Sequence, residues 1–154
     1  MDNTQQGKQK VLKGAEALFM RYGIKSVTMD DVSRELGMSK KTLYQYVENK
    51  ADLIRQVILE HIREEKEAMA EIRATAVDAI DEILKIARYV LEVLRQTSPN
   101  VIYDLRKYYR ESWRLMEDLH REYVYEVIKA NIHRGVEQGL YRPGLDPDII
   151  ARLY

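Results

Sequence analysis

Residues 28–50 read TMDDVSRELGMSKKTLYQYVENK and carry the signals of two short helices joined by a tight turn. The hydroxyl of Thr28 can cap the first helix, with Asp31 three residues further on, and Gly37 ends it. Ser39 offers a second N-cap after a turn of only a few residues. The two capped segments predict a helix-turn-helix.

The second of these helices has two faces of different chemistry. Leu43 and Val47 lie four residues apart and are expected to point inward. The outer face carries a high density of polar side chains, namely long hydrogen-bond donors, a hydroxyl and a phenol. They are Lys40, Lys41, Thr42, Tyr44 and Gln45. Lysine can donate to guanine O6 and N7, glutamine can bridge adenine N6 and N7, and threonine can touch a thymine methyl. This outer face therefore suits the major groove of DNA.

Hydroxyls and an ammonium around this face could bond phosphates. They belong to Ser39, Tyr44, Tyr46 and Lys50, and the N–H groups at the starts of the neighbouring helices could serve the same purpose. Such contacts would position the helix on the duplex without reading its sequence. A second interpretation stays open, in which both tyrosines are packing residues and the lysines form a solvated face.

The rest of the chain also predicts helices. Its three prolines and seven glycines fall almost entirely where a helical apolar period stops. A first helix ends at Gly23 and carries an apolar stripe of Val11, Ala15, Leu18 and Tyr22, with Leu12 and Phe19 beside it. A long helix starts at Lys50 and continues into the lower seventies, and further helices are expected over residues 75–96, 99–111 and 113–138. The predicted fold class is all-α.

Composition excludes several classes of protein. The 154 residues hold 25 basic and 25 acidic side chains, so no global positive field indicates a nucleic-acid partner. Cysteine is absent, which excludes disulfides, thiolate zinc sites and cysteine nucleophiles and is compatible with a reducing compartment. No apolar run approaches the roughly 20 residues needed to span a bilayer, and residues 1–10 are polar rather than signal-like. We expect a cytoplasmic protein with no membrane partner.

Residues 8–55 resemble the N-terminal domain of the TetR family of bacterial transcription regulators. The likeness is carried by Ala15 to Phe19, Gly23, Thr28, Val32, Leu36-Gly37-Met38-Ser39, Leu43-Tyr44-Gln45-Tyr46 and Asn49-Lys50-Ala51-Asp52-Leu53. It implies a three-helix DNA-binding domain over residues 1–50. A long fourth helix would join this domain to a helical effector-binding and dimerisation domain over residues 51–154.

The resemblance also implies roles for single residues. In the family, the positions that match Thr28, Tyr44, Tyr46 and Lys50 commonly hold phosphates, and those that match Lys40, Lys41, Thr42 and Gln45 face the bases. Two positions depart from the pattern, because Val47 stands where Phe is usual and Lys41 where a small residue is frequent. The operator sequence of a relative therefore does not transfer to this chain.

The C-terminal part concentrates aromatic and soft side chains, as an apolar effector pocket with a few polar handles would require. The candidate effector-binding residues are Tyr89, Tyr103, Trp113, Met116, His120 and Tyr123. Ordinary core packing also explains most of them. Glu117-x-x-His120 matches half of a di-iron bundle signature, but the second half is missing, so no metal and no other cofactor is expected.

The sequence predicts a last helix, with Asp146 as its N-cap and Pro147 at its first position. In the TetR family two further helices typically build the four-helix interface of the dimer. The resemblance therefore predicts that the 154-residue chain is truncated, and it assigns the homodimer to the full-length protein.

Together these features predict a sequence-specific DNA-binding transcriptional regulator, a repressor that a small-molecule effector releases. Its dimer would place two recognition helices in successive major grooves of a near-palindromic operator. The alternative is a helical small-molecule binding or scaffolding protein with a non-functional helix-turn-helix, which the zero net charge favours. An enzyme is not expected, because His61, His120 and His133 are scattered and no phosphate loop or nucleophile motif occurs.

Overall fold

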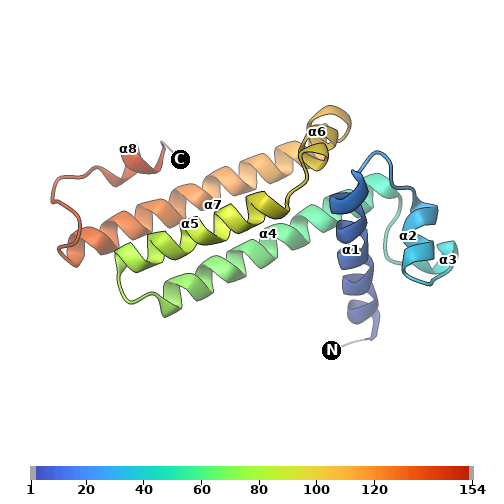
Figure 1. Cartoon of the computed structure of the whole chain (residues 1–154), viewed down its shortest axis with the longest axis horizontal. Coiled ribbons are helices and arrows are strands. Elements are labelled where there is room, and N and C mark those ends of the chain that lie inside the picture. Colours follow the sequence, from blue (N-terminus) through green and yellow to red (C-terminus); the bar gives the residue numbers. More distant parts are fainter. Residues whose placement is uncertain (1–2, 153–154) are drawn as a thin grey trace. The chain divides into compact units, whose positions relative to one another are not determined.

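The computed structural model describes residues 3–152, without the side chains of residues 3, 4 and 119. Within this range the chain is all-helical with short connections (Figure 1). The helices are α1 (Asn3–Tyr22), α2 (Met29–Glu35), α3 (Lys40–Leu43), α4 (Lys50–Thr75), α5 (Ala79–Gln96), α6 (Pro99–Tyr108), α7 (Arg110–Glu137) and α8 (Pro147–Ala151). The all-α fold, with a three-helix N-terminal unit followed by a long fourth helix, is confirmed.

The chain divides into two compact units. Unit 1 holds the residues up to His61 together with Arg95–Leu115, and unit 2 holds Ile62–Leu94 together with the residues from Met116 onward. The predicted domain boundary after Lys50 stays a prediction. Each unit has its own buried residues, which are described separately below.

The core of unit 1 is built around the apolar stripe of α1. Val11 and Ala15 are fully buried there, and Leu43 and Leu53 are equally inaccessible on α3 and α4. The remaining buried aliphatic and aromatic side chains of this core include Leu12, Leu18, Phe19, Ile24, Val27, Val32, Val47 and Ile54. Burying these side chains removes apolar surface from water, which is the main force that holds α1–α4 together.

Tyr22 was expected on the buried stripe of α1, and this expectation is wrong. The side chain is 52% exposed. Phe19 in the same turn and Ile24 just after the helix are buried, so of these side chains Tyr22 alone turns to solvent where α1 ends before Gly23, whose φ is 82°. The Tyr22 ring instead lies under the Arg21 guanidinium, 5.1 Å from its centre.

Two glycines let the helix-turn-helix approach α1 closely. A Cβ on Gly7 would overlap the hydroxyl of Tyr46, and a Cβ on Gly14 would overlap the side chain of Leu36. Tyr46 and Leu36 belong to the ends of the two short helices, so both ends rest directly on the backbone of α1. Any side chain at either glycine would push the helix-turn-helix away from α1.

Unit 2 is organised by a polar network between the start of α5 and the end of α7. Glu82 is 1% exposed, and its carboxylate accepts a hydrogen bond of 3.0 Å from Arg134. The Asn131 amide donates to the carbonyl of Ala79 at 2.9 Å and accepts from the Tyr141 hydroxyl at 2.9 Å. An apolar cluster of Ile128, Ile132 and Ala151 lies further along α7 and α8.

The end of the described chain agrees with its sequence signals. The carboxylate of Asp146 accepts hydrogen bonds from the N–H groups of Asp148 and Ile149, at 2.9 and 3.1 Å. Helix α8 runs to Ala151, and the last two residues of the expected helix lie outside the described range. None of the helices within residues 3–152 has the length and apolarity to cross a bilayer.

We expect Arg134→Met to lower the free energy of unfolding by about 3–5 kcal/mol, because Glu82 would stay buried without its cation. The double variant Glu82→Met/Arg134→Met should recover most of this loss, since apolar side chains often replace a buried ion pair without net cost. Urea unfolding followed by circular dichroism measures both changes. As a control, Arg121→Met removes an exposed pair with Glu117 and should cost less than about 1 kcal/mol. Equal losses for the single and double variants would contradict this account.

Candidate nucleic-acid interface

The start of α2 is fixed by a reciprocal capping box. The Thr28 hydroxyl accepts from the N–H of Asp31 at 3.1 Å, and the Thr28 N–H donates back to the Asp31 carboxylate at 2.9 Å. Hydrogen bonds from Thr28, with Arg34 nearby, hold the pKa of Asp31 below its usual value. The Thr28 hydroxyl also donates to this carboxylate at 2.6 Å, so a phosphate bound here would have to compete with Asp31 for that proton.

Helix α3 is capped by Ser39, as predicted. Its hydroxyl accepts from the N–H of Thr42 at 3.1 Å and lies 2.9 Å from the Thr42 hydroxyl. The α-helix lasts only from Lys40 to Leu43, one turn less than the sequence suggested. The next residues continue as a tighter turn, in which the N–H groups of Gln45 and Tyr46 bond to carbonyls three residues back, at 3.2 and 3.0 Å. This tightening lets the chain bury both Leu43 and Val47 and still reach the start of α4.

The outer face keeps its predicted composition, but its members differ in their surroundings. Lys41, Tyr44 and Gln45 are exposed. Lys40 is also exposed and forms an ion pair with Asp30 of α2. Thr42 is half-buried beside Ser39, and Tyr46 is half-buried against α1. Four of these six predicted residues are therefore exposed, and two are half-buried.

Lys50, at the first position of α4, turns toward α6. Its ammonium lies 3.4 Å from the carbonyl oxygen of Lys25 and 5.9 Å from the centre of the Tyr109 ring. Burial lowers the pKa of Lys50, and attraction to Asp104 and Asp31 opposes that shift. A DNA phosphate at this position would have to draw the ammonium away from these partners.

A contact that the sequence did not reveal joins α6 to the turn between α1 and α2. Asp104 is 7% exposed, and its carboxylate accepts from the backbone N–H of Lys25 at 2.8 Å. The Lys25 ammonium lies 3.2 Å from the Tyr108 hydroxyl and 4.6 Å from the centre of its ring. A hydrogen bond from Lys25 lowers the pKa of Tyr108, whereas burial and the charge of Asp104 raise that of Tyr109. The sequence did contain a sign that Asp104 is buried, because Asp104 has the helical spacing of the inward-facing Val101 and Leu105.

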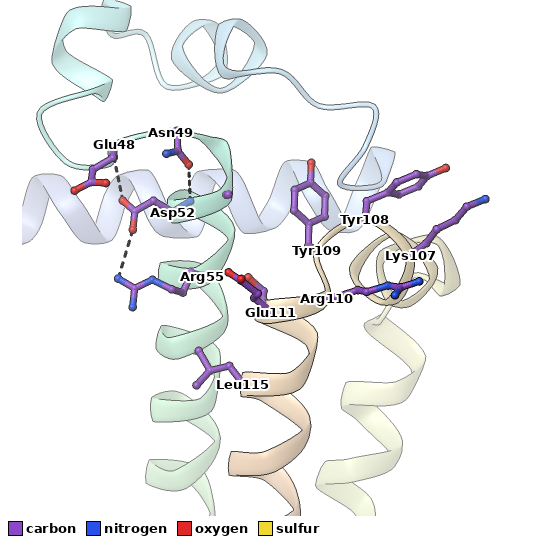
Figure 2. A pocket seen from close by; sticks show the side chains of 12 residues that line it. Glu48, Asn49, Asp52, Arg55, Lys107, Tyr108, Tyr109, Arg110, Glu111 and Leu115 are labelled. Atoms are coloured by element: carbon purple, nitrogen blue, oxygen red, sulfur yellow. Dashed lines mark hydrogen bonds and ion pairs between the residues drawn. The ribbon is translucent and has the colours of Figure 1, made fainter.

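The start of α4 is oriented by two hydrogen bonds that involve Asp52. Asn49 accepts from the N–H of Asp52 at 2.9 Å, and Asp52 accepts from the N–H of Glu48 at 3.0 Å (Figure 2). Burial raises the pKa of Asp52, but hydrogen bonds from Glu48, Gln56 and Arg55 lower it more, so the net shift is downward. This cap fixes the direction in which α4 leaves the helix-turn-helix.

An open pocket of about 590 Å³ lies beside this cap in unit 1 (Figure 2). Its lining mixes both charges with two phenols and comprises Glu48, Asn49, Ala51, Asp52, Arg55, Lys107, Tyr108, Tyr109, Arg110, Glu111, Ser112 and Leu115. None of the six predicted effector-binding residues lines this pocket.

The predicted effector-binding residues are not gathered in one unit. Tyr103 and Trp113 belong to unit 1, where Tyr103 is 54% exposed. The other four, Tyr89, Met116, His120 and Tyr123, belong to unit 2.

Three of those four surround Glu65 of α4. Its carboxylate lies 3.4 Å from His120 Nδ1, and burial together with the charge of Glu65 raises the pKa of Tyr89 and of Tyr123. In the part of the chain that the structure describes, no three side chains of His, Asp or Glu come together as metal ligands.

Comparison with known proteins places this geometry in a family. Residues 11–57 match the family model described as bacterial regulatory proteins, tetR family. Residues 11–57 are therefore a TetR-family domain. The matched residues run from the buried stripe of α1 through the helix-turn-helix to the start of α4.

Relatives extend the likeness beyond the TetR domain. The HTH-type transcriptional regulator YvaF of Bacillus subtilis, uncharacterised, is 23% identical over 130 residues, which cover 84% of this chain and 67% of that protein. A TetR-family regulator from Agrobacterium tumefaciens has the same fold, with a TM-score of 0.76, 19% identity and coverage of 98% and 82% of the two chains. The fatty acid regulator FadR of Bacillus subtilis, solved with stearoyl-CoA, gives a TM-score of 0.71 at 16% identity, covering 94% and 79%. These relatives are transcriptional regulators and support a DNA-binding regulator here.

We expect Asp104→Asn to strengthen binding to all duplex DNA by about two- to fivefold, the equivalent of about 0.5–1 kcal/mol. The amide keeps an acceptor for the Lys25 N–H but removes the charge that holds Lys50 toward α6. Fluorescence anisotropy with labelled duplex measures the change.

Two variants serve as controls for this prediction. Glu111→Gln removes a carboxylate charge from unit 1 without touching Lys25 or Lys50, and it should give a smaller gain. In a Lys50→Met background the gain from Asp104→Asn should vanish, as a double-mutant cycle requires for coupled residues. Weaker binding by Asp104→Asn in a folded protein would show that the carboxylate only positions the α1–α2 turn.

Proposed function

We propose that this protein is a sequence-specific DNA-binding repressor whose reading element is α3 and the turn that follows it. The observation that carries the proposal is the capped helix-turn-helix, whose outward surface exposes Lys41, Tyr44 and Gln45. These side chains offer an ammonium, a phenol and an amide, which suit phosphates and base edges in a major groove. They reach DNA without breaking any contact that supports the fold.

The nine proposed DNA-binding residues fall into two groups by role. Lys40, Lys41, Thr42 and Gln45 are proposed to face bases, and Thr28, Ser39, Tyr44, Tyr46 and Lys50 to hold phosphates. Some of these roles need a local exchange of partners. Lys40 would leave Asp30, and Lys50 would leave the Lys25 carbonyl. Phosphates are strong acceptors for such cations, and release of DNA counterions adds to the gain.

The regulated form is proposed to be a homodimer that binds a near-palindromic operator, with half-site spacing set by the dimer. We propose that a small-molecule effector binds in unit 2 near Tyr89, Met116, His120 and Tyr123 and releases the DNA. Support comes from the Glu65 cluster described above and from the bound stearoyl-CoA of the similar FadR structure. A coupling of about 1–3 kcal/mol would weaken DNA binding about 5- to 150-fold.

The α6 contact offers a route for this coupling. Asp104 holds the turn that leads into α2. A shift of α6 would therefore move the Lys25 backbone and change the electrostatic attraction between Asp104 and Lys50. Both groups belong to the same unit as the reading segment. An effector therefore has to change only the position or order of α6 to alter how the reading segment is held.

Selection from a random duplex pool, followed by titration against salt, tests the proposed function. Enrichment of a palindrome is the expected outcome, with affinity that falls steeply as salt rises. Weak binding without sequence preference would favour the alternative, a helical small-molecule binding protein whose helix-turn-helix does not engage an operator. The zero net charge is the observation in favour of that alternative.

Substitutions on the outer face should separate the two proposed roles. Gln45→Ala should cost about 1–3 kcal/mol at one base position and relax the preference there. Tyr44→Phe should weaken all duplexes alike, because it removes only a phosphate donor. Glu71→Gln, on an exposed part of α4 in unit 2, serves as the control and should change neither property. An unchanged base preference in Gln45→Ala would remove that residue from the reading set.

A further inference from the structure

The start of α7 is a helix end without a side-chain cap. Helix α7 begins one residue after α6 ends, and the N–H of Trp113 donates to the carbonyl of Tyr109 at 3.0 Å. Among the described residues, nothing accepts a hydrogen bond from the N–H groups of Arg110, Glu111 and Ser112. The positive end of a 28-residue helix is therefore left open, and such an end attracts negatively charged groups.

A buried hydroxyl in the same helical turn also lacks a partner. Ser112 lines the open pocket of about 590 Å³ in unit 1 and is only 8% exposed. Its hydroxyl forms no hydrogen bond within the described range. The polar atom of that range that is both sealed from solvent and unpartnered is Gln56 Oε1, so the Ser112 hydroxyl stays accessible from the pocket. A hydroxyl in such a place suits a ligand that accepts its proton.

The pocket also holds charged groups that the fold does not pair. Asp52 and Arg55 pair with each other at 3.6 Å, whereas Glu111 and Arg110 have no ion pair in the part of the chain that the structure describes. Figure 2 shows Glu111 between α4 and the first turn of α7. A simple anion at the start of α7 would therefore be repelled by a nearby carboxylate. A ligand that carries both charges would find a partner for each.

We propose that this pocket binds an α-amino acid in its zwitterionic form. The carboxylate would accept from the free N–H groups at the start of α7 and from the Ser112 hydroxyl, and the ammonium would pair with Glu111. Both charges of an α-amino acid lie on the same carbon, and their two protein partners are neighbours in one helical turn. Ala51, Tyr109 and Leu115 offer surface for an apolar side chain, and the volume is in the range of small-molecule pockets.

This site differs from the effector site proposed for unit 2, and the inference goes beyond the proposed function. All of its lining residues belong to unit 1, where the pocket lies beside the hydrogen bonds of Asn49 and Asp52 that orient α4. An occupant would join the start of α4 to the start of α7. Binding can be measured without DNA, so a failure of this inference and a failure of the DNA-binding function are distinguishable.

Isothermal titration calorimetry with each of the standard amino acids, repeated at a second temperature, tests the proposal. We expect apolar ones such as L-leucine to bind with a Kd of about 10 μM to 1 mM. Isocaproate is leucine without its ammonium, and isoamylamine is leucine without its carboxylate. Each should bind at least about tenfold more weakly than leucine. Absence of binding by every amino acid up to about 10 mM, or equal binding of leucine and isocaproate, overturns the proposal.

Two variants locate the site. Ser112→Ala removes the hydroxyl at little cost to the fold and should weaken amino-acid binding about tenfold. Ser33→Ala is the matched control, because Ser33 is 7% exposed, lies outside the pocket and donates its hydroxyl to the Asp30 carbonyl at 3.0 Å. It should leave the affinity unchanged. Full affinity in Ser112→Ala would place the ligand elsewhere in the protein and overturn the proposal.

Glu111→Gln tests the pairing with the ammonium. This variant should reduce the advantage of leucine over isocaproate, and it should leave isocaproate binding equal or stronger because a carboxylate charge has gone. A structural role of Glu111 alone would instead weaken both ligands alike. An unchanged preference for leucine in Glu111→Gln would overturn the proposed arrangement of the two charges.

Discussion

A single buried carboxylate, that of Asp104, determines how the DNA-reading segment is held within unit 1. It accepts the N–H of Lys25 in the turn that leads from α1 into α2, and the same turn presents its carbonyl to Lys50 at the start of α4. Three elements are therefore tied together through one short piece of backbone. Because the Asp104 carboxylate is 7% exposed, breaking this hydrogen bond would leave a buried acceptor unsatisfied, so the contact is costly to break.

Charge in this protein acts locally, since its net charge is zero. The cations near the proposed DNA surface are each placed beside a group that moderates them: Lys40 beside Asp30, and Lys50 beside the Lys25 carbonyl and Asp104. Lys41 has no such acidic neighbour among the described ion pairs, and it is one of the two positions that depart from the usual pattern of the TetR family. The proposed DNA surface thus combines two cations that have nearby partners, Lys40 and Lys50, with one, Lys41, that has no acidic neighbour among those pairs.

The sequence was sufficient for features that depend on local geometry. Capping at Thr28, Ser39 and Asp146 is decided by hydrogen bonds within four residues, and the buried pair Leu43 and Val47 follows from helical spacing. Features that depend on what lies across the fold were missed. Tyr22 has the right spacing for burial, but its side chain turns to solvent between the buried Phe19 and Ile24. Tyr46 offered a hydroxyl for phosphate, but only the structure shows that it rests on Gly7.

The same distinction explains why the effector site was harder to predict than the reading segment. Aromatic content identified Tyr89, Tyr103, Trp113 and Tyr123 without saying which of them are neighbours. The structure divides them between the two units and brings Tyr89 and Tyr123 near Glu65, a residue with no signal of its own in the sequence. Contacts between helices far apart in the chain depend on the rotation of each helix, which periodicity alone does not provide.

Helix α5 carries aliphatic side chains on two faces, since Ala79 is buried on one and Leu84 is exposed on the other. These two faces raise a problem of specificity that the polar network of unit 2 resolves. A helix with aliphatic side chains on opposite sides could bury either one, because the hydrophobic gain is not directional. Glu82 and the carbonyl of Ala79 lie on the inner face, and each has a partner on α7, in Arg134 and Asn131. Turning α5 over would set Arg134 and Asn131 of α7 against aliphatic side chains without these partners, which is unfavourable. The buried pair of Glu82 and Arg134 therefore favours the observed orientation of α5, with its inner face in the core of unit 2.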